Sequence, residues 1–98
     1  MNVSWSPQAL TRINEIAAYI AQNNASAAEK WVNAVFNRVH LLRDFPHSGR
    51  IVPEMNHPSV REVFVKKYRI VYRVERKLIK VMTVRHGMQI LPLDEIEE

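Results

Sequence analysis

The sequence predicts a single α+β domain in which an N-terminal strand and a two-helix antiparallel hairpin pack on a small antiparallel β-sheet. Two observations predict this class. Apolar residues repeat at helical spacing over residues 10–42, and three strand-length segments rich in Val, Ile, Phe and Tyr follow from residue 60. A chain of 98 residues can bury a core without a disulfide or a metal. We therefore treat residues 1–98 as one domain, with an acidic tail over about residues 87–98.

The first helix is preceded by a short strand. Val3 and Trp5 alternate with polar residues, which is typical of a half-buried strand. Ser6 is the predicted N-cap of the helix, because Pro7 supplies a fixed backbone angle suited to the first helical position. Apolar residues then recur every three or four positions, and the helix is predicted to end near residues 23–24.

The second helix is predicted to begin with Ser26 as its cap, because Glu29 follows three residues later at the capping-box spacing. Its apolar face carries Ala28, Trp31, Val32, Val35, Val39 and Leu42. The connection to the first helix is very short, so the two helices must run antiparallel, and their shared apolar stripe needs a covering layer. Proline and glycine between residues 45 and 58 predict a loop after this hairpin.

Three strands are predicted at residues 60–65, 69–74 and 78–84, joined as an antiparallel meander with a tight connection at residues 75–77. Side chains alternate between the two faces of a sheet. The middle strand therefore sends Ile70, Tyr72 and Val74 toward the helices, and Arg69, Val71 and Arg73 toward solvent or a ligand. One face of the sheet is thus predicted to be basic.

Composition excludes several classes of chemistry. The chain has no Cys, which removes disulfides, thiolate nucleophiles and cysteine-ligated metals, and its two Gly leave no material for a phosphate-binding loop. The four His lack metal-binding spacing, so we expect no metal and no cofactor. Apolar runs are too short for a signal peptide or a membrane span, and we expect a cytoplasmic protein with no membrane partner.

Positive charge is concentrated in the predicted sheet. Four of the acidic residues lie in the tail, at Asp94, Glu95, Glu97 and Glu98. Between residues 61 and 85 stand Arg61, Lys66, Lys67, Arg69, Arg73, Arg76, Lys77, Lys80 and Arg85. Such a block favours an anionic partner, with Lys66, Lys67, Arg73 and Lys80 as candidate contacts, but it is equally typical of a sheet edge protected from aggregation by its charges.

One group of residues suits RNA chemistry. Cleavage of RNA by its own 2′-hydroxyl needs a proton acceptor, a proton donor and cations that stabilise the phosphate. His86 could take part in the proton transfers, while Arg61, Arg69 and Arg85 could hold the phosphate. The same residues are also compatible with binding alone, and physical reasoning favours binding over catalysis.

The sequence resembles the RelE/ParE superfamily of toxins from bacterial type II toxin-antitoxin systems, which includes plasmid stabilisation proteins. The resemblance spans nearly the whole chain and rests on the opening Val-Ser-Trp-Ser-Pro-Gln-Ala, Phe45-Pro46, Ser48-Gly49-Arg50, Arg61-Glu62, Tyr68 to Val74, and Thr83-Val84-Arg85-His86-Gly87. It implies a small antiparallel sheet packed by two N-terminal helices, in agreement with the order of elements predicted from periodicity.

The superfamily divides by target. RelE-like members cleave mRNA on the ribosome with Lys, Arg and often Tyr or His side chains, whereas ParE-like members bind DNA gyrase and have lost that set. Here Arg69 matches the Arg of the Tyr-Arg-hydrophobic-hydrophobic-Tyr segment, Arg61 stands for a catalytic Lys, and Arg85 with His86 lies near the C-terminal active residues. No Tyr follows Tyr72 and Val63 occupies the place of a second cation, so the RelE-like set is incomplete.

The resemblance therefore implies a ParE-like toxin that inhibits growth by binding DNA gyrase and is neutralised by a cognate antitoxin. Two alternatives remain open: a RelE-like, metal-independent endoribonuclease that acts on mRNA at the ribosome, and a non-toxic stabilisation protein. The implied partners are the antitoxin and either gyrase or the ribosome with its mRNA. A homodimer or a hetero-oligomer with the antitoxin is compatible with each alternative.

Overall fold

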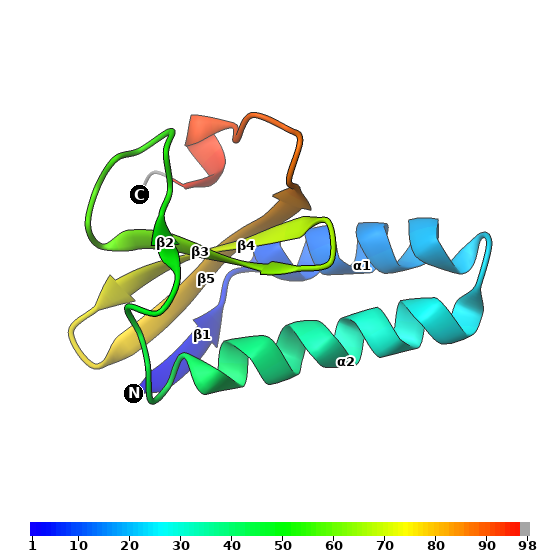
Figure 1. The fold of residues 1–98 in the computed structure, drawn as a ribbon, viewed down its shortest axis with the longest axis horizontal. Coiled ribbons are helices and arrows are strands. Elements are labelled where there is room, and N and C mark those ends of the chain that lie inside the picture. The colour runs from blue at the N-terminus through cyan, green and yellow to red at the C-terminus, as the bar shows by residue number, and fades with distance from the viewer. Residues whose placement is uncertain (97–98) are drawn as a thin grey trace.

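The predicted order of strand, helical hairpin and strands is confirmed in a computed structural model, which describes residues 1–96 (Figure 1). The strands are β1 (Asn2–Trp5), β2 (Arg50–Ile51), β3 (Val60–Val65), β4 (Tyr68–Glu75) and β5 (Leu78–His86). The helices are α1 (Pro7–Ala21) and α2 (Ala25–Leu41), and a single 3₁₀ turn, η1 (Leu93–Glu95), lies in the predicted acidic tail. Glu97 and Glu98 of that tail lie outside the described residues.

The strands form one mixed sheet in the order β1-β5-β4-β3-β2. The strands from β2 to β5 are antiparallel as predicted, whereas β1 pairs with β5 in parallel. No tight turn joins β1 to β5, since the chain leaves β1 through both helices, so the antiparallel arrangement is not imposed there. Strand β2 falls in the predicted loop, because its two residues, which pair with Arg61 and Glu62, are too few to show an alternating pattern.

Side-chain caps fix where the two helices begin. The Ser6 hydroxyl accepts a hydrogen bond from the Ala9 amide at 3.0 Å and donates to the Met82 carbonyl at 2.8 Å, so the predicted cap also ties α1 to β5. The predicted cap of α2 is wrong. Asn24, in an extended conformation, accepts from the Ala27 amide at 3.0 Å, and Ser26 lies inside the first turn.

The helices cover one face of the sheet, with α2 below the strands in Figure 1 and α1 beside them, and close the main core. This core contains Ala9, Ile13, Trp31, Val35, Val39, Leu42, Val63, Val65, Ile70, Tyr72, Ile79, Val81 and Val84. The predicted inward face of β4 is thereby confirmed for Ile70 and Tyr72, with Val74 packed at the margin of the core. Burial of so many large apolar side chains is the main favourable term in folding.

The opposite face of the sheet is covered by other segments of the chain, which corrects the prediction that it faces solvent or a ligand. Val71 is fully buried in a second cluster with Val52, Val60, Leu91 and Ile96. The segment after β2 contributes Val52 to this cluster, and the C-terminal segment contributes Leu91 and Ile96. Both segments lie above the sheet in Figure 1. Alternation correctly assigns Val71 to this face, but it carries no information on segments that return from elsewhere in the chain.

A β-bulge in β5 changes which positions of this strand face the helices. Val71 pairs with Thr83 and Tyr72 pairs with Val81, so Met82 has no partner across the ladder. The extra residue shifts the alternation, and both Val81 and Val84 therefore face the helices although they are three positions apart. Thr83 and Arg85 then point to the second face.

Tyr72 connects the sheet to the loop after α2. Its ring is fully buried, its hydroxyl donates to the Pro46 carbonyl at 2.8 Å, and it accepts from the Gly49 amide at 3.1 Å. A Cβ at Gly49 would lie 2.6 Å from this hydroxyl and 2.5 Å from the Glu62 carbonyl oxygen, so only glycine permits so close an approach. Burial raises the pKa of the Tyr72 phenol, which remains a donor at neutral pH.

We expect Tyr72→Phe to lower the free energy of unfolding by about 1–2 kcal/mol, because it leaves the buried Pro46 carbonyl and Gly49 amide without their partner. Tyr72→Ala should cost about 3–5 kcal/mol, since it also leaves a cavity. Urea denaturation followed by circular dichroism measures both. Equal stability of the Phe variant and the wild type would show that the hydroxyl does not hold the loop.

Candidate functional site

The four residues proposed for RNA chemistry do not share one face of the sheet. Arg69 and Arg85 are cross-strand partners on the second face, as their positions on neighbouring strands predict. Arg61 is paired with Tyr72 and therefore lies on the helix side. His86 is paired with Tyr68, which packs against the helix-side core. The predicted grouping therefore holds for two of the four side chains.

Arg69 is a buried structural residue, because its whole guanidinium is occupied. It is 3% exposed, and it forms a two-bond fork to Glu54 at 2.8 Å for each nitrogen-oxygen pair. Its Nε donates to Glu62 at 2.6 Å and its Nη1 also donates to the Gln89 carbonyl at 3.1 Å. Glu62 is buried too, and its second oxygen accepts from Arg50 at 2.6 Å. Two carboxylates thus hold Arg69 where a phosphate would have to bind.

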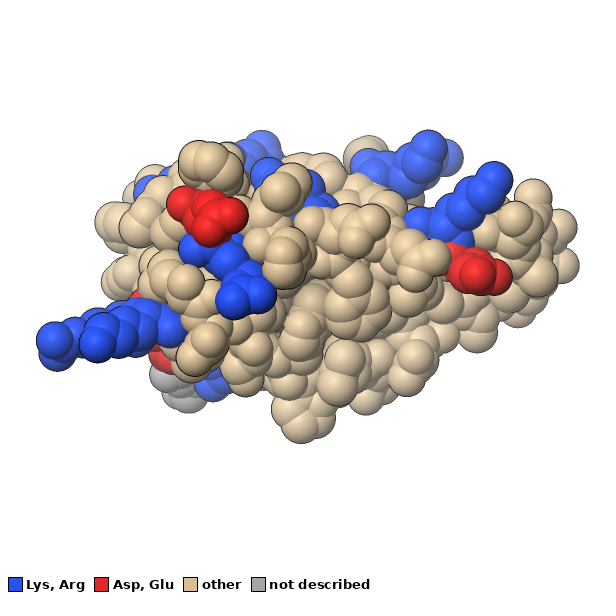
Figure 2. Space-filling model, turned by 90° about the horizontal axis from the view of Figure 1, so that it is seen from below, with Lys and Arg blue, Asp and Glu red and all other residues tan. Residues whose placement is uncertain are grey.

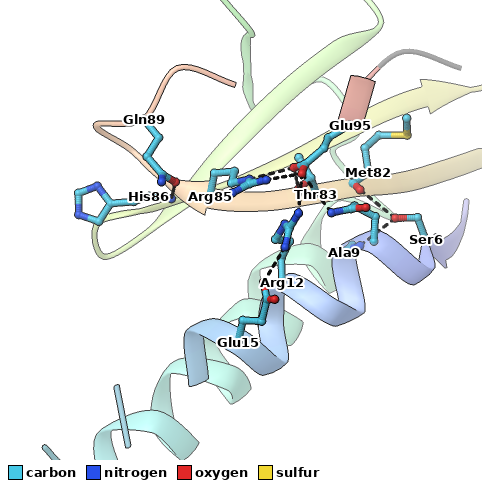
Figure 3. Close-up of polar contacts among 11 residues, drawn as sticks. Ser6, Ala9, Arg12, Glu15, Met82, Thr83, Arg85, His86, Gln89 and Glu95 are labelled. Carbon is cyan, nitrogen blue, oxygen red and sulfur yellow. Dashed lines mark hydrogen bonds and ion pairs between the residues drawn. The ribbon is translucent and has the colours of Figure 1, made fainter. Parts of the chain in front are cut away.

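A third carboxylate, that of Glu95, is held by donors from two elements, α1 and β5 (Figure 3). Its oxygens accept from Gln8 Nε2 at 3.1 Å, Arg12 Nη2 at 2.7 Å, Thr83 Oγ1 at 2.8 Å, Arg85 Nε at 2.9 Å, and Arg85 Nη2. Arg12 also binds Glu15 at 2.6 Å on the exposed side. The predicted acidic tail therefore docks on the basic face through Glu95 and neutralises Arg85.

These arrangements shift the pKa values of two carboxyl groups. The hydrogen bonds from Arg69 lower the pKa of Glu54 to about 2, against the opposing effect of burial. Burial acts to raise the pKa of Glu95, but hydrogen bonds from Arg85, Arg12 and Thr83 outweigh it and lower the pKa to about 2. Both groups are ionised at neutral pH and act as fixed negative charges inside the basic face.

His86 lies outside this charged cluster. Its ring contacts Tyr68 edge-on, with centroids 5.5 Å apart, and its Nδ1 accepts from the Met88 amide at 3.1 Å. Figure 3 shows the ring pointing away from Glu95. It borders an open groove of about 400 Å³ together with Arg12, Tyr19, Tyr68 and Arg85. Both arginines in the groove are already bound to Glu95.

Arg61 anchors the loop rather than a ligand. Its Nε donates to the Pro58 carbonyl at 2.9 Å, and its Nη1 donates to the carbonyls of Gly49 at 3.0 Å and His47 at 3.4 Å. An arginine that supplies its donors to backbone carbonyls compensates loop groups that have no partner in a sheet or helix. These contacts therefore account for Arg61 as a structural residue, and no RNA substrate is needed to explain its position.

The four cations predicted to bind an anionic partner occupy two separate places. Arg73 and Lys80 are cross-strand partners on the second face, where Arg73 Nη2 donates to the Ile96 carbonyl at 3.2 Å. Lys66 and Lys67 form the exposed two-residue turn between β3 and β4. Only this second pair is presented to solvent as a basic tip.

The carboxylates that organise the second face are the residues that sequence analysis missed. Glu62 interrupts a Val-rich strand, and a charge in a buried strand requires a partner of opposite sign. That signal was present, but the partner could not be chosen among nine basic residues. Glu54 and Glu95 lie in segments with no periodic pattern, and no local signal reveals their contacts.

Two further findings concern the described residues. No three side chains among His, Asp and Glu of residues 1–96 gather as they would to hold a metal ion. Neither α1 nor α2, the helices of the described chain, is long and apolar enough to cross a membrane.

We expect the free energy of unfolding to fall as pH drops from about 5 to about 2. In the unfolded chain Glu54 and Glu95 would bind protons near their ordinary pKa of 4.5, but in the folded protein they bind them only near 2, so acid favours unfolding. Glu95→Gln should lower stability at pH 7 by about 1–3 kcal/mol and weaken the acid dependence.

Chemical denaturation at a series of pH values measures this dependence. Glu29→Gln is the control, since Glu29 is exposed and forms no ion pair within residues 1–96. A wild-type stability that stays constant down to pH 3 would contradict the assignment of the two carboxylates.

Comparison with known proteins identifies the family of this chain. The sequence model of the family described as "ParE toxin of type II toxin-antitoxin system, parDE" matches residues 3–91. A protein of Sinorhizobium fredii named "Putative toxin Y4kP" is 34% identical over 92 residues, which cover 92% of each chain. A chain of a solved structure described as "Chromosomal ParDE TA system from P. aeruginosa" aligns with a TM-score of 0.71 at 21% identity, covering 88% of this chain and 95% of that one, and shows the same fold. The chain belongs to the ParE toxin family of type II toxin-antitoxin systems.

Proposed function

We propose that this ParE-family toxin inhibits growth by binding DNA gyrase, without catalysis, and that a cognate antitoxin neutralises it. Membership of the ParE family supports a toxin with an antitoxin partner. The observation that carries the non-catalytic mechanism is the occupancy of the arginines: Arg69 is bound by Glu54 and Glu62, and Arg85 by Glu95.

A ribonuclease would have to release these arginines before a phosphate could bind. Removing one partner of a buried ion pair costs about 3–5 kcal/mol, because the other charge remains buried without compensation. Arg61 contributes nothing to such a site, since it lies on the helix side and its donors are used by the loop. These costs argue against the RelE-like alternative and favour a surface that acts by contact.

We expect the purified chain to inhibit ATP-dependent DNA supercoiling by gyrase and to leave cell-free translation of an intact mRNA unchanged. Translation in that reaction needs ribosomes but no gyrase, so the two assays separate the targets. Addition of the antitoxin should restore supercoiling. Halted translation with mRNA shortened only in the presence of ribosomes would instead establish the ribonuclease, and no effect in either assay would favour a non-toxic protein.

We also expect His86→Ala to retain growth inhibition when it accumulates to the wild-type level, since the side chain is half-exposed and makes one ring contact and one hydrogen bond. Its effect on stability should stay below about 1 kcal/mol. Restored growth with an unchanged melting temperature would show that His86 is catalytic.

Arg69→Ala is the matched control for loss of fold. It leaves Glu54 and Glu62 without their common partner, and the unfolding free energy should fall by about 3–5 kcal/mol. Loss of toxicity in that variant therefore carries no information about catalysis unless the soluble, folded fraction is measured beside it.

A further inference from the structure

The turn between β3 and β4 has an apolar hollow on each side. The hollow on the helix side measures about 340 Å³ and is lined by Ile20, Ala27, Trp31, Ala34, Val65 and Tyr68, with Lys30 at the same site. The hollow on the other side measures about 490 Å³ and is lined by Phe64, His86, Gly87 and Met88. Lys66 and Lys67 line both hollows, so the turn forms a basic ridge between them.

Fixed contacts form the walls of the two hollows. In the first, the Trp31 ring packs against Tyr68 with centroids 5.2 Å apart. In the second, the Gly87 amide donates to the Lys67 carbonyl at 2.6 Å, and a Cβ at Gly87 would lie only 3.0 Å from the Phe64 ring. The second hollow exposes large apolar side chains, since Phe64 is 44% and Met88 87% accessible to solvent. Exposed apolar surface of this kind, bordered by charges, is typical of interaction sites.

The lysines of this site differ from four arginines elsewhere in the chain. Arg12, Arg50, Arg69 and Arg85 are each bound to a carboxylate. Lys30, Lys66 and Lys67 form no ion pair within residues 1–96. Lys66 also holds a left-handed backbone conformation, with φ 56°, that places a charged side chain at a turn position usually given to Gly or Asn. Positive charge is therefore available at this end of the molecule.

We propose that the Lys66–Lys67 turn and its two hollows bind an acidic peptide segment of a partner protein. One apolar side chain of the segment fills each hollow, and the carboxylates between them face Lys30, Lys66 and Lys67. Two apolar hollows separated by a basic ridge require two apolar groups joined by an acidic link, which a peptide supplies and a small carboxylate does not. This inference goes beyond the proposed function, since it does not depend on the target of the toxin.

The site reaches only the N-terminal part of α2 and differs from the uncharged surface farther along that helix. Figure 2 shows the molecule from below, and uncharged side chains cover most of the face that α2 presents. Phe36, Leu41 and Phe45 are exposed on or just beyond this helix. That surface lacks a charge pattern that would select one class of partner, whereas the ridge of lysines between two hollows does.

The test uses a short synthetic peptide in which glutamates separate one leucine from one phenylalanine, with a fluorophore at its end. Fluorescence anisotropy with the full chain should show saturable binding. A peptide with lysines in place of the glutamates, and one with serines in place of leucine and phenylalanine, should each bind at least about tenfold more weakly, equivalent to about 1.4 kcal/mol. Absence of binding by the first peptide, or equal binding by all three, would overturn the proposal.

The chain offers a matched pair of charge reversals. Lys66→Glu with Lys67→Glu should weaken binding at least about tenfold. Arg76→Glu with Lys77→Glu reverses two charges in the other two-residue turn, between β4 and β5, where Lys77 has the same left-handed conformation with φ 66°. This control should change the affinity less than about twofold, because it lies outside both hollows.

An uncharged variant tests the helix-side hollow by itself. Ala27→Leu adds a side chain to its wall in the first turn of α2, and leucine is a good helix former, so the fold should persist. We expect binding to weaken at least about fivefold with an unchanged circular dichroism spectrum. Equal losses from both charge-reversal pairs would show attraction by net charge alone and would overturn the proposal, as would full binding by folded Ala27→Leu.

Discussion

Arg69 brings together three parts of the chain that would otherwise not meet on the second face of the sheet. Its guanidinium binds Glu62 on β3, Glu54 in the loop after β2, and the Gln89 carbonyl in the C-terminal segment. Glu54 in turn accepts from the Leu91 amide at 3.0 Å, which places Leu91 over Val52, Val60 and Val71. The second apolar cluster therefore depends on a buried charge network whose geometry satisfies each ionised group.

Because of their ion pairs with glutamates, Arg69 and Arg85 are not available to bind a phosphate. A strand that carries many arginines suggests a phosphate-binding surface, but here the carboxylates of Glu54, Glu62 and Glu95 take up the donors of the arginines they face. Exposed positive charge consequently stands at the two turns of the sheet, on Lys66, Lys67, Arg76 and Lys77, and not across its middle. Long-range attraction to an anionic surface can still arise from such a distribution, because steering depends on the summed field more than on any one contact.

Local patterns were sufficient for most of the fold. Periodicity located both helices and three strands, and the Ser6 cap followed from residue type and position. The failures have different causes. The parallel pairing of β1 and the covering of Val71 result from segments that meet after a long excursion of the chain, whereas β2 is too short to show an alternating pattern. The Asn24 cap was missed for a different reason, because two capping residues lay within one turn of each other.

The candidate site was less accessible to sequence analysis than the fold. Adjacent strand positions correctly brought Arg69 beside Arg85, but a count of charges does not assign partners. Arg85 is bound by a glutamate ten positions later, and Arg12 by the same glutamate 83 positions later. No pattern within one element encodes such a choice. The sequence assigned Arg61 and His86 to their strands but not to a face of the sheet. Because the bulge in β5 shifts the alternation, the position of His86 in the sequence does not by itself give the face on which it lies.

The bulge at Met82 changes which sequence positions of β5 face the helices. Before Met82 the odd-numbered positions Ile79 and Val81 face the helices, and after it the even-numbered position Val84 does so. Removing Met82 would leave Val81 and Thr83 as neighbours that alternate normally, so the faces on which Val84 and Arg85 lie would not change. What the strand would lose is the Met82 carbonyl, which accepts from the Ser6 hydroxyl at 2.8 Å, so the extra residue serves the start of α1 and not the division of β5 between its two faces.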